Sequence, residues 1–69
     1  MLMLKNKEEK LKKFEVEYSI QKNNIIVNRS IIIESINDPN KIIRLAKLNI
    51  STMERIFIQD VKILGFKTV

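Results

Sequence analysis

Apolar and polar side chains alternate along residues 14–20, and the chain then reaches a pair of asparagines. The apolar positions are Phe14, Val16, Tyr18 and Ile20. A period of two is typical of a strand with one buried face. Asn23 and Asn24 can adopt the positive φ angles of a type I′ turn, although less readily than an Asn-Gly pair. The pattern therefore predicts a β-hairpin over residues 14–34.

A two-residue turn fixes which side chains of the hairpin face each other. The apolar pairs are Ile20 with Val27, Val16 with Ile31, and Phe14 with Ile33. The remaining pair sets Arg29 against Tyr18, where the arginine stem can lie along apolar surface and the guanidinium can stack on the ring. We favour instead a bulge near Asn28 that turns Arg29 to solvent, because an unpaired buried arginine is rare. A contact between Arg29 and an anion or a partner is the functional alternative.

Residues 38–50 carry the signals of an amphipathic helix. Asp38 is a good N-cap, and Pro39 suits the first helical position. The apolar stripe consists of Ile42, Ile43, Leu45, Ala46 and Ile50. This spacing places the apolar side chains on one side of a helix. Because Asn49 can end a helix, we predict a helix over residues 39–49.

Residues 51–64 fit two different structures. Ser51 and Glu54 match the capping box of a second helix, and Gly65 suits the end of one. Many β-branched side chains and two compact apolar runs favour a strand, which needs a bulge near Gln59–Asp60 to keep one apolar face. We favour the strand, because a third strand turns a marginal hairpin into a sheet that a helix can cover.

The resulting fold class is α+β, a two-layer β-β-α-β domain whose three-stranded antiparallel sheet has the order 2-1-3 and is covered by one helix. The alternative is a β-hairpin plus two helices. We expect residues 1–13 to be a charged segment, helical or frayed, and residues 14–69 to be a single domain. The predicted core consists of Val16, Ile20, Val27, Ile31, Ile42, Ala46, Ile56 and Ile58.

The composition removes several kinds of catalytic and metal-binding site. The 69 residues include no cysteine, no histidine and one glycine, so the chain has no thiolate, no imidazole and no glycine-rich phosphate loop. Glu15 and Glu17 lie two apart on a predicted strand, but they lack a pocket, a third ligand and a nucleophile. We read them as a solvent-facing strand surface, and we expect no enzyme activity, no cofactor and no metal site.

The net charge of +5 raises the question of a nucleic-acid partner. More than half of this charge comes from residues 1–13, which hold five lysines and two glutamates. Lys41, Arg44 and Lys47 occupy the outward arc of the predicted helix, where they can contact phosphates. No aromatic side chains alternate with them to stack on bases. Nucleic-acid binding through this basic helix face is therefore the alternative function.

Open sheet edges and an isoleucine-rich strand favour a protein partner. If the apolar hairpin pairs face the helix, Ile26 and Ile32 lie on the opposite face beside an open edge. We expect a small non-enzymatic binding protein that recognises another protein, or forms a homodimer, through the sheet edge or face. Its contacts would include Ile26, Ile32 and Arg29.

The opening residues MLML run directly into charged residues. This apolar stretch is too short for an export signal or a membrane span, so we expect a cytoplasmic protein with no membrane partner. Small β-β-α-β chains of this composition resemble accessory proteins of phages and mobile elements. The likeness covers no diagnostic motif and implies no site residues.

Overall fold

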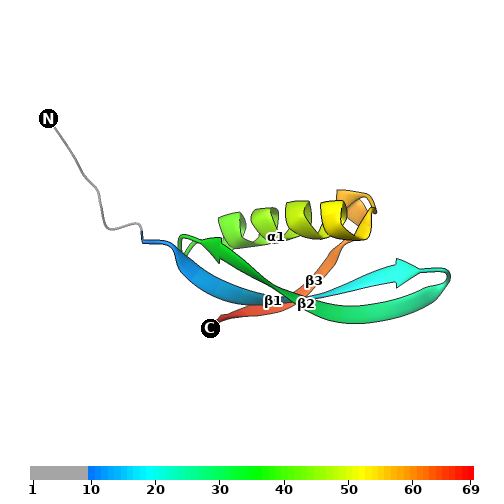
Figure 1. Cartoon of the computed structure of the whole chain (residues 1–69), viewed down its shortest axis with the longest axis horizontal. Helices are drawn as coiled ribbons and strands as arrows, with labels where there is room; N and C mark the ends of the chain where they lie inside the picture. The colour runs from blue at the N-terminus through cyan, green and yellow to red at the C-terminus, as the bar shows by residue number, and fades with distance from the viewer. Residues whose placement is uncertain (1–9) are drawn as a thin grey trace, which may run out of the picture.

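The computed structural model describes residues 10–69, which form a three-stranded sheet, one α-helix and one short 3₁₀ helix. The elements are β1 (Lys12–Lys22), β2 (Ile25–Ser35), α1 (Pro39–Glu54), η1 (Ile58–Asp60) and β3 (Lys62–Thr68). The strands are antiparallel in the order β2-β1-β3, and α1 lies over one face of the sheet (Figure 1). The predicted α+β class, strand order and single covering helix are confirmed.

The hairpin has the predicted register. Asn23 and Asn24 have φ angles of 51° and 66°, which a type I′ turn requires. The pairing of β1 with β2 runs from Lys22 opposite Ile25 to Lys12 opposite Ser35 without a shift. The predicted bulge near Asn28 is therefore wrong. Arg29 faces α1 and not solvent, because it pairs there with the carboxylate of Glu54.

The helix begins where the sequence predicts and ends later. The carboxylate of Asp38 accepts a hydrogen bond of 3.0 Å from the backbone N–H of Asn40, which caps the first turn. Asn49 does not stop the helix, because its side chain donates to the carbonyl of Leu45 (2.8 Å) within it. The end comes at Arg55, whose φ of 60° is left-handed and whose N–H bonds to the carbonyl of Ser51.

Neither structure predicted for residues 51–64 is correct as a whole. The first four residues complete α1, Ile58–Asp60 form the turn η1, and β3 begins only at Lys62. No bulge lies at Gln59–Asp60; the shift in the pairing of β3 occurs opposite Glu17 and Tyr18, where Leu64 is the extra residue. The helix predicted in residues 1–13 is not found at residues 10–13, and the rest of that segment lies outside the described residues.

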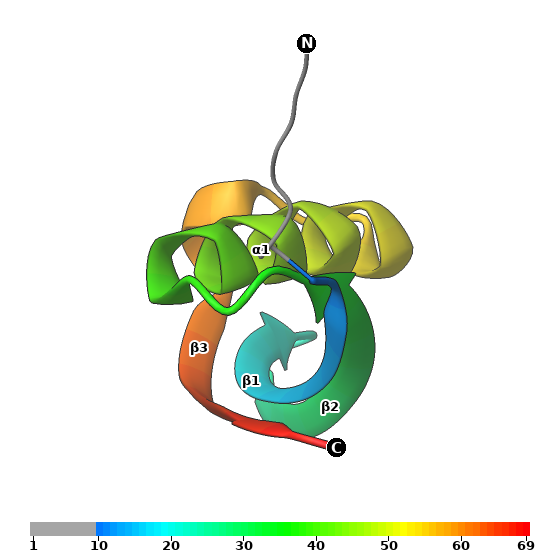
Figure 2. The same ribbon diagram turned by 90° about the vertical axis from the view of Figure 1, so that its left-hand side faces the viewer.

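The core lies between α1 and the sheet, which curls beneath the helix (Figure 2). The buried apolar side chains are Phe14, Val16, Tyr18, Ile20, Ile33, Ile42, Ala46, Ile50 and Val61. Of the predicted core, Val27, Ile31 and Ile56 are half-buried against this cluster. Ile58 is 45% exposed, because it lies in η1 and not in a strand, so its predicted burial is wrong. Among the described helices, α1 included, none is long and apolar enough to cross a membrane.

Candidate functional site

The two edges of the sheet are not equally protected against pairing with another strand. β3 has seven residues, two lysines and a bulge, which are the features that block edge-to-edge pairing. β2 has eleven residues, no proline, no lysine and no bulge. A long, regular edge strand of this kind is a template for an added strand.

The free hydrogen-bonding groups of β2 can be assigned from the register. Lys22 and Ile25 close a two-residue hairpin, so odd-numbered residues of β2 bond to β1 and even-numbered ones point outward. The hydrogen bond from Val69 N–H to the carbonyl of Lys13 (3.1 Å) shows that odd residues of β1 bond to the β3 side, as this assignment requires. The outward backbone groups belong to Ile26, Asn28, Ser30, Ile32 and Glu34. No strand within residues 10–69 pairs with them.

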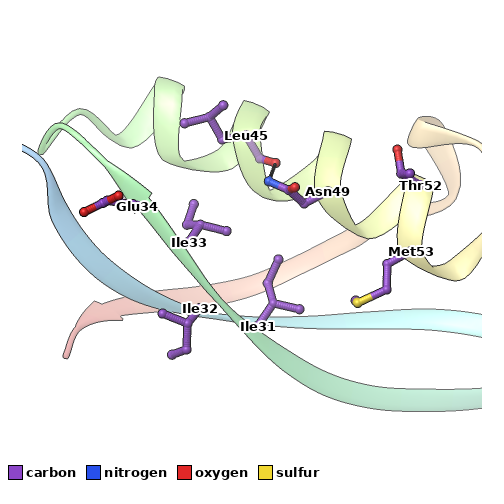
Figure 3. A pocket seen from close by; sticks show the side chains of 8 residues that line it. All are labelled: Ile31, Ile32, Ile33, Glu34, Leu45, Asn49, Thr52 and Met53. Carbon is purple, nitrogen blue, oxygen red and sulfur yellow. Dashed lines mark hydrogen bonds between the residues drawn. The ribbon is translucent and has the colours of Figure 1, made fainter.

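A groove of about 500 Å³ runs between this edge and α1, and we call it the β2–α1 groove. Its apolar lining comes from Ile31, Ile32 and Ile33 of β2 and from Leu45 and Met53 of α1. Figure 3 shows Glu34 near one end and Asn49 and Thr52 along the helix side. Polar side chains therefore border an apolar floor, as in many peptide-binding sites.

Large apolar side chains beside the groove are exposed to solvent. Ile32 is 54% exposed, Met53 is 56% exposed, and Leu48 on the neighbouring helix surface is also exposed. Apolar area left in water forgoes about 25 cal/mol per Å² of burial free energy. Exposed apolar side chains next to an open strand edge are typical of an interaction surface.

A buried carboxylate lies at the end of α1, beneath the hairpin. The side chain of Glu54 is 3% exposed and lies 2.8 Å from Lys22 Nζ, 3.1 Å from Arg29 Nη1 and 2.8 Å from the hydroxyl of Tyr18. Hydrogen bonds from Lys22 and Tyr18 lower the pKa of Glu54, and they outweigh the opposing effect of burial. Burial, together with the hydrogen bond to Glu54, raises the pKa of Tyr18 to about 12.

This cluster explains the orientation of Arg29. The arginine faces α1 opposite Tyr18, and its Nη1 atom donates to both oxygens of Glu54, at 3.1 and 3.4 Å. Its side chain remains 51% exposed, and Ile31 follows it on the same face of β2. A guanidinium carries five N–H donors, and within residues 10–69 only Nη1 is engaged. Glu54 thus fixes Arg29 beside the β2–α1 groove with donors still available.

Sequence reasoning missed Glu54, although a signal was present. Ile42, Ala46 and Ile50 mark the buried stripe of α1 at intervals of four, and Glu54 is the next position in that series. The spacing of Glu54 from Ser51 suggested a capping box instead. In the structure, the hydroxyl of Ser51 donates to the carbonyl of Leu48 (2.9 Å). A carboxylate on an apolar stripe predicts a cationic partner, which Lys22 and Arg29 supply.

The structure does not join Ile26 and Ile32 into one surface. Both lie on the open face of the sheet, meaning the face away from α1, but they are about 20 Å apart along β2. Asn28 and Ser30 lie between them, and the Ser30 hydroxyl donates to Glu15 (3.2 Å). Ile32 alone borders the β2–α1 groove.

The remaining candidate residues lie on separate surfaces. Lys41 and Arg44 are exposed on α1, and Lys47 is half-buried. Glu15 is engaged by Ser30 and by Lys67, whose Nζ lies 3.6 Å away. Among residues 10–69, no three acidic side chains converge as a metal site would need.

Comparison with protein families, with curated proteins and with solved structures found no significant match to this chain.

Proposed function

We propose that this protein is a non-enzymatic binding protein that holds an extended segment of another protein against β2. The observation that carries the proposal is the unprotected edge of β2 beside the apolar β2–α1 groove. Strand addition uses main-chain hydrogen bonds for affinity and side-chain pockets for specificity. The edge of β2 offers free main-chain groups, and the β2–α1 groove offers an apolar pocket.

The backbone contribution comes from the outward groups of β2. Five residues, from Ile26 to Glu34, each offer an N–H and a carbonyl to an added strand. The N–H and carbonyl groups are already aligned by pairing with β1, so little conformational entropy is lost on the protein side when the segment binds.

The side-chain contribution comes from the groove. Successive side chains of an added strand point to opposite faces, so every second one would enter the space between β2 and α1. There they would meet Ile31, Ile33, Leu45 and Met53. We therefore expect the bound segment to be apolar at alternate positions.

The charges of β2 favour a partner other than a second copy. Arg29 precedes Ile31 on the face of β2 that α1 covers, and Glu34 lines the groove. If β2 paired with itself around Ile32, Arg29 would face Ser35 of the copy and Glu34 would face Ser30. Neither charge would meet its opposite, whereas a segment with an acid near Arg29 and a base near Glu34 satisfies both.

The test begins with selection of ten-residue peptides from a random displayed library on the immobilised full chain. Selected peptides are then titrated against the ¹⁵N-labelled protein. We expect amide shift changes concentrated in the outward residues of β2 and in the lining of the groove. Changes confined to the β3 edge or to the open face would contradict the proposal.

Variants distinguish binding at the β2 edge from non-specific binding to exposed apolar side chains. Ser30→Pro removes an outward N–H without breaking a backbone bond to β1, and the hydrogen bond it loses is the exposed one from its hydroxyl to Glu15. Met53→Lys places a charge in the groove. Both should weaken peptide binding about tenfold or more, which corresponds to the removal of one or two good interactions. The matched control is Leu64→Lys, which alters an exposed apolar side chain on β3 and should leave binding unchanged.

Sedimentation across a wide concentration range tests the choice of partner. We expect a monomer in the absence of peptide. A dimer that Ser30→Pro dissociates would show that a second copy occupies the edge, and the proposal of a separate protein partner would fail.

A further inference from the structure

We propose that the outer surface of α1 is a second binding site, separate from the β2–α1 groove, and that its ligand is the phosphate backbone of a nucleic-acid duplex. The site consists of Lys41, Arg44, Lys47 and Arg55, which we call the α1 cation row. Lys41, Arg44 and Arg55 are exposed, and Lys47 is half-buried at the flank of the helix.

Within residues 10–69, the charges differ between the open face of the sheet and the surface of α1. The open face of the sheet carries three cations and three acids, so its charges balance. These residues are Lys13, Lys62, Lys67, Glu15, Glu17 and Glu34. The α1 cation row is less balanced: the acid inside α1 is Glu54, whose side chain is buried, and the nearby acids are Asp38, which caps the helix, and Asp60 in η1. Within residues 10–69, ion pairs form at Lys22, Arg29 and Lys67 but not in the row.

The charge pattern of α1 works against the stability of the helix. Lys41 lies in the first turn, where the macrodipole disfavours a cation, and the nearest acid in the chain is the N-cap residue Asp38. Arg44 has Lys41 one turn before it and Lys47 one turn after it, and like charges at this spacing repel. The helix itself therefore gains no stability from the spacing of these three cations.

Arg55 adds an independent observation. Its φ of 60° and ψ of 48° are left-handed, a conformation that glycine adopts without strain and that is unfavourable for residues with a Cβ atom. A cation thus occupies a position where glycine would make the helix end more stable. Residues that break a local rule of this kind are concentrated at functional sites.

The length of the row identifies the class of ligand. Lys41 and Arg55 are about 21 Å apart along the helix axis, which is too far for one phosphate group and suits a series of them. No aromatic side chain interrupts the row, so bases would not stack on it, as they do in single-strand binding. The chemistry therefore fits the regularly spaced phosphates of a duplex, read without regard to sequence.

An anionic membrane is the competing polyanion. Helices that bind membrane surfaces place a broad apolar stripe opposite their cations. The apolar stripe of α1 is already buried against the sheet, at Ile42, Ala46 and Ile50. A duplex is therefore the better match.

The experiment measures binding of the full chain to a labelled 20-base-pair duplex of mixed sequence, by fluorescence anisotropy, at several salt concentrations from 50 to 200 mM. The row variant combines Lys41→Gln, Arg44→Gln and Lys47→Gln. The matched control combines Lys13→Gln, Lys62→Gln and Lys67→Gln. Both variants remove three positive charges and keep residues 1–9, so they differ only in which face is neutralised.

The row variant should bind the duplex at least about tenfold more weakly at low salt, and its plot of log affinity against log salt should be shallower by about 0.9 for each phosphate that is no longer neutralised. The control should stay within about threefold of the unmodified chain. Equal losses of affinity in the two variants would mean that net charge alone is responsible and would overturn the proposal, as would no binding at 50 mM salt.

Two further measurements complete the test. Vesicles of phosphatidylcholine with phosphatidylserine replace the duplex, and binding to them that needs the row, without duplex binding, would also overturn the proposal. Circular dichroism confirms that each variant is folded. If the triple row variant unfolds, Arg44→Gln is compared with Lys62→Gln, and the same difference in salt dependence, about a third as large, is expected.

Discussion

The hydroxyl of Tyr18, in the middle of β1, donates a 2.8 Å hydrogen bond to the carboxylate of Glu54, in the last turn of α1. The two residues are 36 positions apart in the chain, and both are buried. Lys22 and Arg29 bind the same carboxylate from the two strands of the hairpin. A single side chain thus connects the helix end to both β1 and β2.

Replacing Glu54 should destabilise the protein. Glu54→Gln keeps the shape of the side chain but leaves Lys22 and Arg29 without a counter-charge. Both cations are more than a third exposed and can regain water, so we expect a loss of about 1–3 kcal/mol and not the larger cost of a fully buried pair. Urea unfolding measures this difference. Glu17→Gln, on the open face, is the control and should change stability by less than about 0.5 kcal/mol.

Acid should weaken the same cluster. The folded state lowers the pKa of Glu54 below its ordinary value of 4.5, so its contribution to stability is present above that pH and is lost as the pH falls through the folded pKa. We expect the free energy of unfolding to decrease below about pH 4.5, and to decrease less in Glu54→Gln. Urea titrations at pH values between 2 and 7 would show this. Parallel curves for the two proteins would contradict the prediction.

The centre of the helix face should be far more sensitive than the turn that follows the helix. Ile42 is fully buried, and its replacement by alanine should cost about 2–4 kcal/mol because a cavity forms in the core. Ile58→Ala removes the same number of atoms from a partly exposed site and should cost about 1 kcal/mol or less. The two melting midpoints give a direct comparison. Equal shifts would mean that η1 is packed as tightly as α1.

Replacing Arg55, the left-handed residue at the end of α1, by glycine should increase the stability of the protein. Arg55→Gly removes the strain of a side chain at φ 60°, and we expect the protein to become about 1 kcal/mol more stable. The same substitution removes one cation of the α1 cation row and should weaken duplex binding. Opposite effects on stability and on binding are the expected result. A decrease in stability would show that the Arg55 side chain makes interactions that outweigh its backbone strain.

The register of the hairpin was predictable because its determinants are local, although the bulge expected near Asn28 is absent. Alternation fixes the buried face of β1, and the two asparagines fix the register of β2. The end of α1 was not predictable in this way. Asn49 is a common helix terminator, but the turn beyond it is stabilised by Glu54, whose partners are 25 and more residues distant.

The candidate site was predictable only in part. The open edge and the isoleucines of β2 followed from the predicted sheet, but the groove depends on how far α1 extends over β2. Met53 lines that groove only because the helix continues past residue 49. Arg29 was placed on the correct face and then assigned to solvent, because its partner lies in a segment that was expected to form a strand.

The attachment of Glu54 to both strands of the hairpin also bears on how the protein opens. The last turn of a helix ordinarily frays first, and its amide hydrogens exchange with solvent ahead of the rest. Here the last turn cannot separate from the sheet without breaking the contacts of Glu54 with Tyr18, Lys22 and Arg29 together. The C-terminal turn of α1 and the hairpin should therefore exchange as one cooperative unit.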